Sequence, residues 1–512
     1  MKVILIQTPI ILPINHSSSH RAVPPLSLAY LNAFLINQGH DSKIIDAPGE
    51  AIDQYTKIPD TEVMINGLTS KQIIQRIPAE TQFIGVSCQH SNEWFHDLLL
   101  IKNIRKSFPQ SIIILGGEHA SATAYKIMSN HSEVDYIVCG EGELPLLKII
   151  ESHTHTAQLP LIPGVAQRRS NQIIQNPKGQ RLSDLSIIPK PNWNGVPLDE
   201  YFKRRLAISS FNKKTMPIIA SRGCPFSCSF CTCNLMWGST WKSRPVGQVI
   251  SEILEYKNKY NIENIDFIDM TVIIDKVWAQ EFCKKMLEEK TGVTFSIPIG
   301  THPKALSPEL LGDLKKAGLE KIVFSTETGS SLTLEKINKD LDLAKIEHLI
   351  KTSIKLNIST KLVLIFGFPD QGFLEVLQSY LYLLRFAIWG GQDVVCLSFV
   401  PYPGTVFFEQ LQKEPSFEQN YSPALLNNDF KTMKSWSKKI PSKSMKWITV
   451  LGMSLFYGFQ FALRPWRFFV LIYRIFITQK PFTALETILF ARLKRAKIKI
   501  LQSEEKYQSD IS

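Results

Sequence analysis

The chain has 512 residues, of which 44% are hydrophobic and 20% charged, so it is too long for one domain and has the ordinary composition of a globular protein. Its net charge of +12 is concentrated in residues 431–500, which contain fifteen Lys and Arg residues and one acidic residue, Glu486. A nucleic-acid enzyme would also carry basic residues along its catalytic groove, so nucleic acid is excluded as the expected partner.

The eight cysteines are sparse outside one central loop, which argues against a disulfide framework and predicts a reducing compartment. The N-terminal run Met1-Lys-Val-Ile-Leu-Ile6 enters a strand pattern directly and shows no signal peptide. We therefore expect a cytoplasmic protein.

Residues 1–152 alternate short apolar runs with helical patterns, as βα repeats do. The expected strands are 3–6, 43–45, 83–86, 112–115 and 136–138, and the expected helices lie near 26–38, 70–77, 92–107, 118–129 and 143–152. This alternation predicts an α/β fold with a doubly wound, Rossmann-like parallel sheet, whose ligands bind at the carboxyl ends of the strands.

Two of these strand ends carry residues suited to a large ligand. Ser87 follows the third strand, and Gly116 and Gly117 follow the fourth. Glycine lets a ligand approach the backbone closely, although a glycine at a strand end is also an ordinary turn residue. From the residues alone, this domain either binds a large ligand or is a Rossmann-like module that binds nothing.

Residues 153–215 are rich in proline and show no sustained period, so we interpret them as a linker with a hairpin around 164–174. Residues 216–415 resume the βα alternation. The expected strands are 216–220, 264–268, 293–299, 320–325, 360–366 and 393–399, and the expected helices are 246–259, 277–289, 307–317, 331–338, 343–356 and 373–388. Six such units predict a partial (β/α)6 barrel of the TIM type, with its chemistry at the carboxyl ends of the strands.

The first strand of this barrel leads into the loop Ser221-Arg-Gly-Cys-Pro-Phe-Ser-Cys-Ser-Phe-Cys231. Its three cysteines, Cys224, Cys228 and Cys231, can act together as metal ligands. A structural zinc site needs a fourth ligand, which Cys233 would supply, whereas a [4Fe–4S] cluster held by three cysteines leaves one iron open for chemistry. A set of unligated thiols is the third alternative. The position of the loop directly after an apolar strand favours the cluster.

The spacing of these cysteines, with Phe230 just before the third, resembles the cluster loop of radical S-adenosylmethionine (radical SAM) enzymes. The resemblance implies that the open iron binds S-adenosylmethionine and reduces it to a 5′-deoxyadenosyl radical, with Phe230 packed near the adenine. It also implies that Asp269, Glu327 and Gly367, which end the second, fourth and fifth strands of the barrel, contact this cofactor.

Residues 1–152 resemble the cobalamin-binding domain that precedes many radical SAM enzymes, through stretches such as Pro24-Pro-Leu-Ser-Leu-Ala-Tyr30. The resemblance implies that Ser87, Gly116 and Gly117 line the slot for the nucleotide tail of cobalamin. No Asp-x-His-x-x-Gly motif occurs in the chain, so a histidine is not expected as the lower ligand to cobalt.

The resemblance, over residues 1–415, implies a cobalamin-dependent radical SAM enzyme that methylates an unactivated carbon. One S-adenosylmethionine would methylate cob(I)alamin, and a second would yield the radical that abstracts a substrate hydrogen. An electron donor such as flavodoxin or ferredoxin is implied. The alternatives are a cyclase or oxidoreductase that uses the same cofactors without methyl transfer, and a non-catalytic cobalamin sensor.

Residues 416–512 form a basic, apolar and helical tail. Residues 447–463 contain no charged side chain, but a membrane span takes about 20 apolar residues and this run is shorter. The run is a membrane span, a buried cap on the barrel or, as we favour, part of a helix pair in a membrane interface, with Lys and Arg among anionic head groups. The sequence thus predicts peripheral contact of residues 430–500 with the inner face of the membrane, and a small-molecule or lipid-like substrate.

Overall fold

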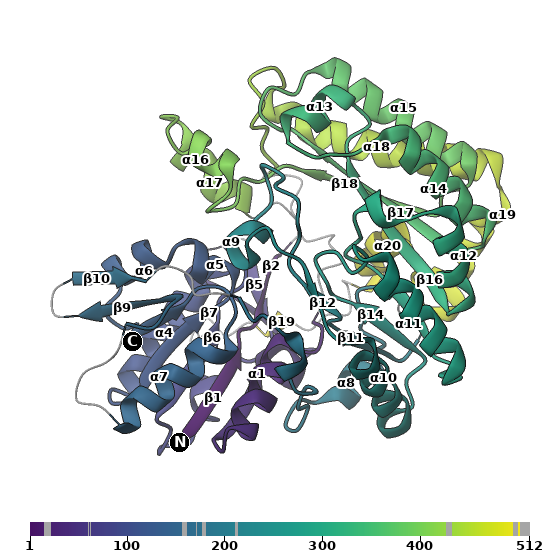
Figure 1. The fold of residues 1–512 in the computed structure, drawn as a ribbon. Coiled ribbons are helices and arrows are strands. Elements are labelled where there is room, and N and C mark those ends of the chain that lie inside the picture. The colour runs from purple at the N-terminus through teal and green to yellow at the C-terminus, as the bar shows by residue number, and fades with distance from the viewer. Residues whose placement is uncertain are drawn as a thin grey trace.

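Figure 1 shows the computed structural model, which describes residues 1–14, 22–59, 61, 63–155, 161–169, 172–176, 181–209, 213–425, 433–494 and 500–501. The N-terminal residues, in purple and blue, build one large sheet, and the teal and green residues build a second. The predicted α/β class is confirmed, with helices on the faces of both sheets.

The N-terminal sheet has the strand order β10-β9-β8-β7-β6-β1-β3. Its strands are β1 (Lys2–Gln7), β3 (Asp41–Asp46), β6 (Phe83–Ser87), β7 (Ile112–Gly116), β8 (Tyr136–Val138), β9 (Val165–Arg169) and β10 (Gln172–Gln175). The first five are parallel, and the order changes direction between β1 and β6. In open α/β sheets such a switch point is where ligands bind. The predicted hairpin is β9 and β10, which extend this sheet because β9 pairs with β8.

The helices of this region are α1 (Leu26–Asn37), α2 (Ala47–Glu50), α3 (Ser70–Ile74), α4 (Trp94–Ser107), α5 (Glu118–Ala122), α6 (Ala124–Asn130) and α7 (Glu143–His155). The helix predicted over 118–129 is therefore interrupted, at Thr123. A small sheet was not predicted, because its strands are too short to show a period. It contains β2 (Ile10–Pro13), β4 (Tyr55–Lys57), β5 (Val63–Asn66) and β19 (Ile500–Leu501).

The second sheet has six parallel strands in sequential order, as a partial barrel requires. Its strands are β11 (Thr215–Ile218), β14 (Asn264–Phe267), β15 (Thr294–Ile297), β16 (Leu319–Glu327), β17 (Ser359–Phe366) and β18 (Asp393–Ser398). Its outer helices are α10 (Val246–Tyr260), α11 (Lys276–Glu288), α12 (Pro308–Lys316), α13 (Ser331–Lys336), α14 (Leu343–Lys355) and α15 (Phe373–Trp389). The predicted (β/α)6 barrel is thus present.

Shorter elements connect these parts. They are η1 (Leu185–Ile187), α8 (Leu198–Lys203), β12 (Ser221–Arg222), α9 (Cys233–Trp237), β13 (Lys242–Ser243), η2 (Pro303–Ala305), α16 (Val406–Leu411) and α17 (Phe417–Leu425). In Figure 1, α9 lies between the two large sheets. The cysteine loop of the barrel therefore faces the N-terminal sheet.

The tail folds onto the barrel as α18 (Ser442–Leu463), α19 (Trp466–Ile472), the π-helical η3 (Tyr473–Thr478) and α20 (Ala484–Lys494). Pro465 separates α18 from α19. One side of α18 is buried, including Met445 and Phe456, whereas Trp447 on its other side is 67% exposed. α18 therefore covers the barrel with one side, as a buried cap would, and leaves its other side exposed to solvent. Among the described helices, none combines the length and hydropathy of a membrane span.

Candidate active site

The cysteine loop follows β11 and is closed at its base by a ribbon of β12 and β13. Gly223 has φ of +93°, and a Cβ there would collide with the carbonyl oxygen of Thr240, so only glycine fits this point of the ribbon. Further along, the backbone N–H of Ser229 donates to the carbonyl of Ile337 at 2.9 Å. The ribbon thus holds the start of the loop, and Ser229 fixes its later part to the barrel.

Asp269, just after β14, is buried beneath the start of this loop. Its carboxylate accepts hydrogen bonds from the backbone N–H of Ala220 at 3.1 Å, from the hydroxyl of Ser221 at 2.5 Å and from the backbone N–H of Ser221. Burial raises the pKa of Asp269 to about 6 despite these bonds. The structure makes Asp269 a support for the cysteine loop, and its contact with S-adenosylmethionine stays a prediction.

The three cysteines of the loop are partly exposed, whereas Cys233, the first residue of α9, is buried. A hydrogen bond from the Cys233 thiol lowers the pKa of Cys224 to about 7. Burial raises the pKa of Cys231 to about 12, and the charges of Cys228 and Cys224 add to this rise. The three loop thiols therefore lie within electrostatic range of one another.

Within the described residues, no group of three His, Cys, Asp or Glu side chains is placed to hold a single metal ion. A cubane cluster makes no such demand, because each of its cysteine thiolates binds a different iron. Three neighbouring thiols on one loop have the ligand type and number that fit a cluster with one open iron.

Lys339 is a site residue that the sequence did not single out. Its ammonium lies 2.5 Å from Glu327 Oε1 and 5.7 Å from the centre of the Phe230 ring. Burial raises the pKa of Cys228, and the charge of Lys339 opposes that rise. Lys339 lies in the turn after α13, where no local pattern distinguishes it from any surface lysine. Only the fold brings it to the cysteine loop.

Glu327 ends β16 with φ of +64°, in the left-handed region. A non-glycine residue in such a sparsely populated conformation costs about 1–3 kcal/mol and is found mostly at functional sites. Its ion pair with Lys339 is buried on both sides, with 7% and 10% of the two side chains exposed. The structure thus brings Glu327 and Phe230 together around Lys339.

Gly367 lies in a different environment from the other predicted residues. Its backbone N–H donates to Gln371 Oε1 at 2.7 Å, and a Cβ at this position would lie 3.0 Å from Met445 Cε. These contacts are with the following turn and with α18 of the tail. They explain a glycine here by packing, and a cofactor contact of Gly367 stays a prediction.

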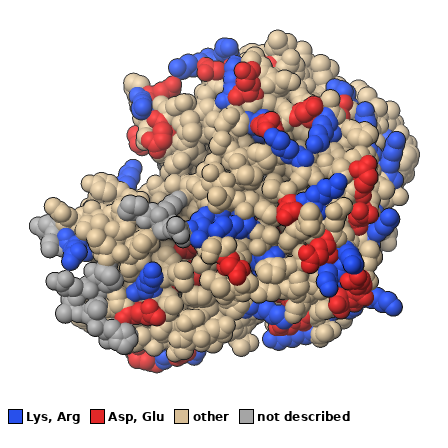
Figure 2. Space-filling view, viewed as in Figure 1, with Lys and Arg blue, Asp and Glu red and all other residues tan. Residues whose placement is uncertain are grey.

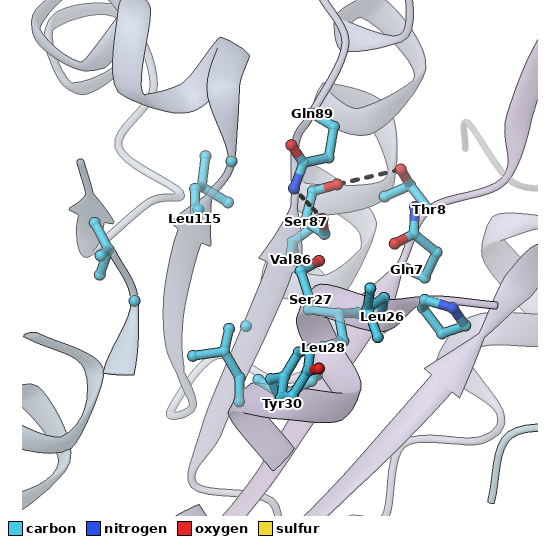
Figure 3. A pocket seen from close by; sticks show the side chains of 18 of the residues that line it. Gln7, Thr8, Leu26, Ser27, Leu28, Tyr30, Val86, Ser87, Gln89 and Leu115 are labelled. Carbon is cyan, nitrogen blue, oxygen red and sulfur yellow. Dashed lines mark hydrogen bonds between the residues drawn. The ribbon is translucent and has the colours of Figure 1, made fainter. Parts of the chain in front are cut away.

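A cavity of about 420 Å³ lies at the switch point of the N-terminal sheet. Ser87, Gly116 and Gly117 line it from the ends of β6 and β7, and Trp237 and Ile268 line it from the barrel side. Figure 3 shows Ser87 beside Thr8 and Gln89 at the strand ends, with Tyr30 and the start of α1 across the cavity. The cavity is thus shared between the two sheets.

The two glycines shape this cavity differently. Gly117 has φ of +107°, and a Cβ there would lie 2.6 Å from the carbonyl oxygen of Cys88, so the backbone itself requires glycine. A Cβ on Gly116 would have no neighbour within 4 Å, so this glycine leaves open space for a ligand. Glu93 also lines the cavity, and burial raises its pKa well above the ordinary value. Sequence reasoning missed Glu93, which lies in no motif.

Buried ion pairs join the N-terminal sheet to the cysteine loop. Arg222, two residues before Cys224, lies 2.6 Å from Glu143 and 3.3 Å from Glu141, and only 8% and 3% of the Arg222 and Glu143 side chains are exposed. Arg222 also lies 5.5 Å from the centre of the Trp237 ring, which lines the cavity. The strand ends and the cysteine loop are therefore held in one fixed relation.

Two domain families match the chain. Residues 15–150 match the B12-binding domain, and residues 218–381 match the radical SAM superfamily. The first range covers β3, β6, β7 and β8 of the sheet that carries the cavity, and the second covers the cysteine loop and β14 to β17 of the barrel.

The chain is similar to several proteins over most of its length. An uncharacterized methyltransferase, PH0819, of Pyrococcus horikoshii is 26% identical over 80% of this chain and 83% of its own. The anaerobic magnesium-protoporphyrin IX monomethyl ester cyclase of Synechocystis is 24% identical over 75% of this chain and 72% of its own. The methyltransferase TsrM of Kitasatospora setae, solved with cobalamin and a [4Fe-4S] cluster bound, has a TM-score of 0.64 at 16% identity, covering 82% of this chain and 75% of its own.

The barrel, its cysteine loop and the matching domain model define the chain as a radical SAM enzyme. It belongs to the part of that superfamily in which a B12-binding domain precedes the radical SAM domain. The predicted cofactors are therefore confirmed at the level of the family as a [4Fe–4S] cluster, S-adenosylmethionine and cobalamin.

Proposed function

We propose that the protein is a cobalamin-dependent radical SAM methyltransferase acting on an unactivated carbon of a small-molecule or lipid-like substrate. One observation carries this proposal: a single cavity is lined by the strand ends of the B12-binding domain and by residues next to the cysteine loop. Methyl donor, radical source and substrate must meet in one water-poor space for this reaction. The shared cavity meets that requirement.

In this proposal Cys224, Cys228 and Cys231 hold the cluster. The cofactors, when bound, would supply a 5′-deoxyadenosyl radical and a methyl group. Lys339, paired with Glu327, would favour the thiolate form of Cys228 as a ligand of the cluster. Asp269 fixes the loop through Ala220 and Ser221, so the thiols keep their spacing. Phe230 and Glu327 would contact S-adenosylmethionine, and Gly367 would form part of the same surface.

The proposed domain division assigns residues 1–152 to the cobalamin domain and residues 216–415 to the radical SAM core. Residues 153–215 would connect them, with the hairpin of β9 and β10 extending the N-terminal sheet, and residues 416–512 would form the tail. Ser87, Gly116 and Gly117 would line the slot for the nucleotide tail of cobalamin. A cavity of about 420 Å³ is within the usual range for a small-molecule site.

The decisive experiment supplies methyl-labelled S-adenosylmethionine and a low-potential electron donor to the reconstituted protein under anaerobic conditions. Candidate substrates come from comparing metabolites of strains with and without the gene. A methyltransferase places the label in the product and releases S-adenosylhomocysteine and 5′-deoxyadenosine. Formation of 5′-deoxyadenosine with an unlabelled product would instead favour a cyclase or oxidoreductase, the alternative to which the similarity with the magnesium-protoporphyrin cyclase points.

Replacing Gly116 with Leu should weaken cobalamin binding while leaving the cluster in place. The new side chain enters open space in the cavity without backbone strain, because Gly116 has ordinary backbone angles. Overfilling a packed site costs about 1–3 kcal/mol, so cobalamin affinity should fall about ten- to hundredfold. Equilibrium dialysis measures the affinity. Gly247→Leu on α10, where a Cβ also meets nothing, is the matched control, and equal loss in both variants would contradict the assignment.

Bound cobalamin should be base-off, with neither its own benzimidazole nor a protein histidine on cobalt. His90 is the one histidine among the described residues that line the cavity, and it is not part of an Asp-x-His-x-x-Gly motif. The electron paramagnetic resonance spectrum of the Co(II) form should therefore lack nitrogen superhyperfine splitting. His90→Ala should leave that spectrum unchanged. Splitting that disappears in His90→Ala would identify His90 as the lower ligand and refute this prediction.

Two further proposals concern partners. A flavodoxin or ferredoxin would donate the electron, because reductive cleavage of S-adenosylmethionine needs a low-potential donor. Residues 430–500 would contact the inner face of the membrane, in keeping with their basic residues and exposed aromatic side chains. Such contact would suit a substrate that partitions into lipid.

A further inference from the structure

The barrel carries an apolar outer face that the proposed chemistry does not use. We define it by the solvent-facing side chains of α15, α18, α19 and η3. We infer that this outer apolar face docks on an anionic phospholipid membrane. The inference rests on the proposed membrane contact of the tail and extends it, because α15 belongs to the radical SAM barrel and not to the tail.

α15 exposes a stripe of large apolar side chains. Leu374, Leu377, Leu381 and Ile388 are 67%, 52%, 52% and 54% exposed, whereas Phe386 on the opposite side is fully buried. A surface helix of a globular protein normally turns charged and polar residues outward. An outer stripe of this kind marks an interaction surface.

The tail continues this face. α18 packs beside α15, where the hydroxyl of Tyr380 donates to the carbonyl of Ile448 at 2.8 Å and Phe386 stacks on Phe456 with 5.4 Å between ring centres. The outward side chains of the tail are again large and apolar, including Trp447, Leu451, Trp466, Phe469, Phe476 and Ile477. The last three of these are 67%, 60% and 69% exposed.

Hydrogen bonds from the turn between α18 and α19 join the tail to the end of α15. Arg464, in the turn between α18 and α19, donates to the carbonyls of Ala387 and Ile388 at 3.0 Å each. The end of α15 is therefore fixed to the start of α19. Figure 1 shows α15 and α18 running along the top of the barrel toward α19, and Figure 2 shows few charged side chains over α15.

The charge around the outer apolar face indicates which kind of partner binds it. Between residues 433 and 494 the one acidic residue is Glu486, whose side chain is 4% exposed and lies 3.3 Å from Arg474. Every other charge there is basic, including Lys443 and Lys446 on α18. A second copy of the chain would bring like charges together, whereas an anionic bilayer accepts aromatic side chains among acyl chains and Lys or Arg among head groups.

The test is co-sedimentation of the full-length protein with vesicles of phosphatidylcholine alone and of phosphatidylcholine mixed with phosphatidylglycerol. The wild type should sediment with the mixed vesicles and far less with the neutral ones. The variant Phe469→Ser/Phe476→Ser/Ile477→Ser should bind at least about tenfold more weakly. Leu374→Ser/Leu381→Ser tests the part contributed by α15 and should also bind several-fold more weakly.

Tyr125→Ser/Val277→Ser is the matched control, because these side chains are 62% and 72% exposed on α6 and α11, outside the face. It should bind like the wild type. Recovery of the wild type in the soluble fraction with both vesicle types would overturn the inference, as would equal binding to both types. If light scattering shows that the wild type is a dimer and that the same substitutions make it a monomer, the face serves self-association. That result would also overturn the inference.

Cleavage of S-adenosylmethionine without vesicles separates this inference from the proposed function. All variants should keep the wild-type cleavage rate, because none of the altered residues belongs to the cofactor site. A wild type that binds vesicles but transfers no methyl group would refute the proposed function and leave the membrane face standing.

Discussion

Replacing any one of Cys224, Cys228 and Cys231 with Ala is expected to abolish the cluster and all reductive cleavage of S-adenosylmethionine. Each thiolate would hold a different iron, so no remaining side chain on the loop can substitute for a lost ligand. The measurement is the thiolate-to-iron absorbance at about 400 nm after anaerobic reconstitution, together with the yield of 5′-deoxyadenosine. Both should fall to the background of the metal-free protein.

Cys233→Ala is the matched control for these three variants. Cys233 is the buried first residue of α9, and its backbone N–H lies 3.5 Å from Cys231 Sγ. Its loss should leave the absorbance in place, because a cluster with one open iron needs three thiolates only. If Cys233→Ala loses the cluster as completely as the other variants do, the site has four thiolate ligands and the open-iron proposal fails.

Replacing Arg222 with Met is expected to lower the free energy of unfolding by about 3–5 kcal/mol, the usual cost of leaving one partner of a buried ion pair uncompensated. The change leaves Glu143 buried without its 2.6 Å partner. Because the pair joins the B12-binding domain to the cysteine loop, the variant should also lose cobalamin affinity. Denaturant unfolding measures the first effect and equilibrium dialysis the second.

The pH dependence of this pair has a definite sign. Burial alone would raise the pKa of Glu143, but the charge and hydrogen bonds of Arg222 outweigh burial and hold it below the ordinary value. The stabilisation is therefore complete above the carboxyl pKa of the unfolded chain, and it is lost as the pH falls through the lower folded pKa. The difference in the free energy of unfolding between the wild type and Arg222→Met should therefore become smaller as the pH falls.

Two further variants distinguish charge pairing from simple packing. Glu143→Gln should destabilise the protein as Arg222→Met does, while the double variant Arg222→Met/Glu143→Gln should cost less than the two single changes added together. Additive effects would show that the two side chains do not act as a pair. Lys190→Met is the control, because it removes a salt bridge to Glu255 in which the two side chains are 41% and 43% exposed. It should change the free energy of unfolding by about 1 kcal/mol or less.

The sequence by itself determined the features that depend on local pattern. The βα alternation predicted both parallel sheets, because the apolar periods of strands and helices depend only on residues that are close together in the sequence. The cysteine spacing indicated one loop, because three ligands within eight residues cannot be far apart in any fold. Ser87 at the end of β6 and Gly116 and Gly117 at the end of β7 indicated a ligand site, because parallel strands bring their carboxyl ends to one edge of the sheet. The basic charge of the tail was visible as composition.

Only the tertiary structure decided which distant side chains meet. Arg222 reaches Glu143 across 79 residues and Lys339 reaches Glu327 around α13, and neither pair follows from a period or a motif. Asp269 was predicted as a cofactor contact, yet its carboxylate is engaged by the loop backbone, which depends on how β14 lies beside β11. The outer side of α15 joins the apolar tail because α18 packs beside it. Each of these is a packing outcome between elements, and sequence patterns describe the elements singly.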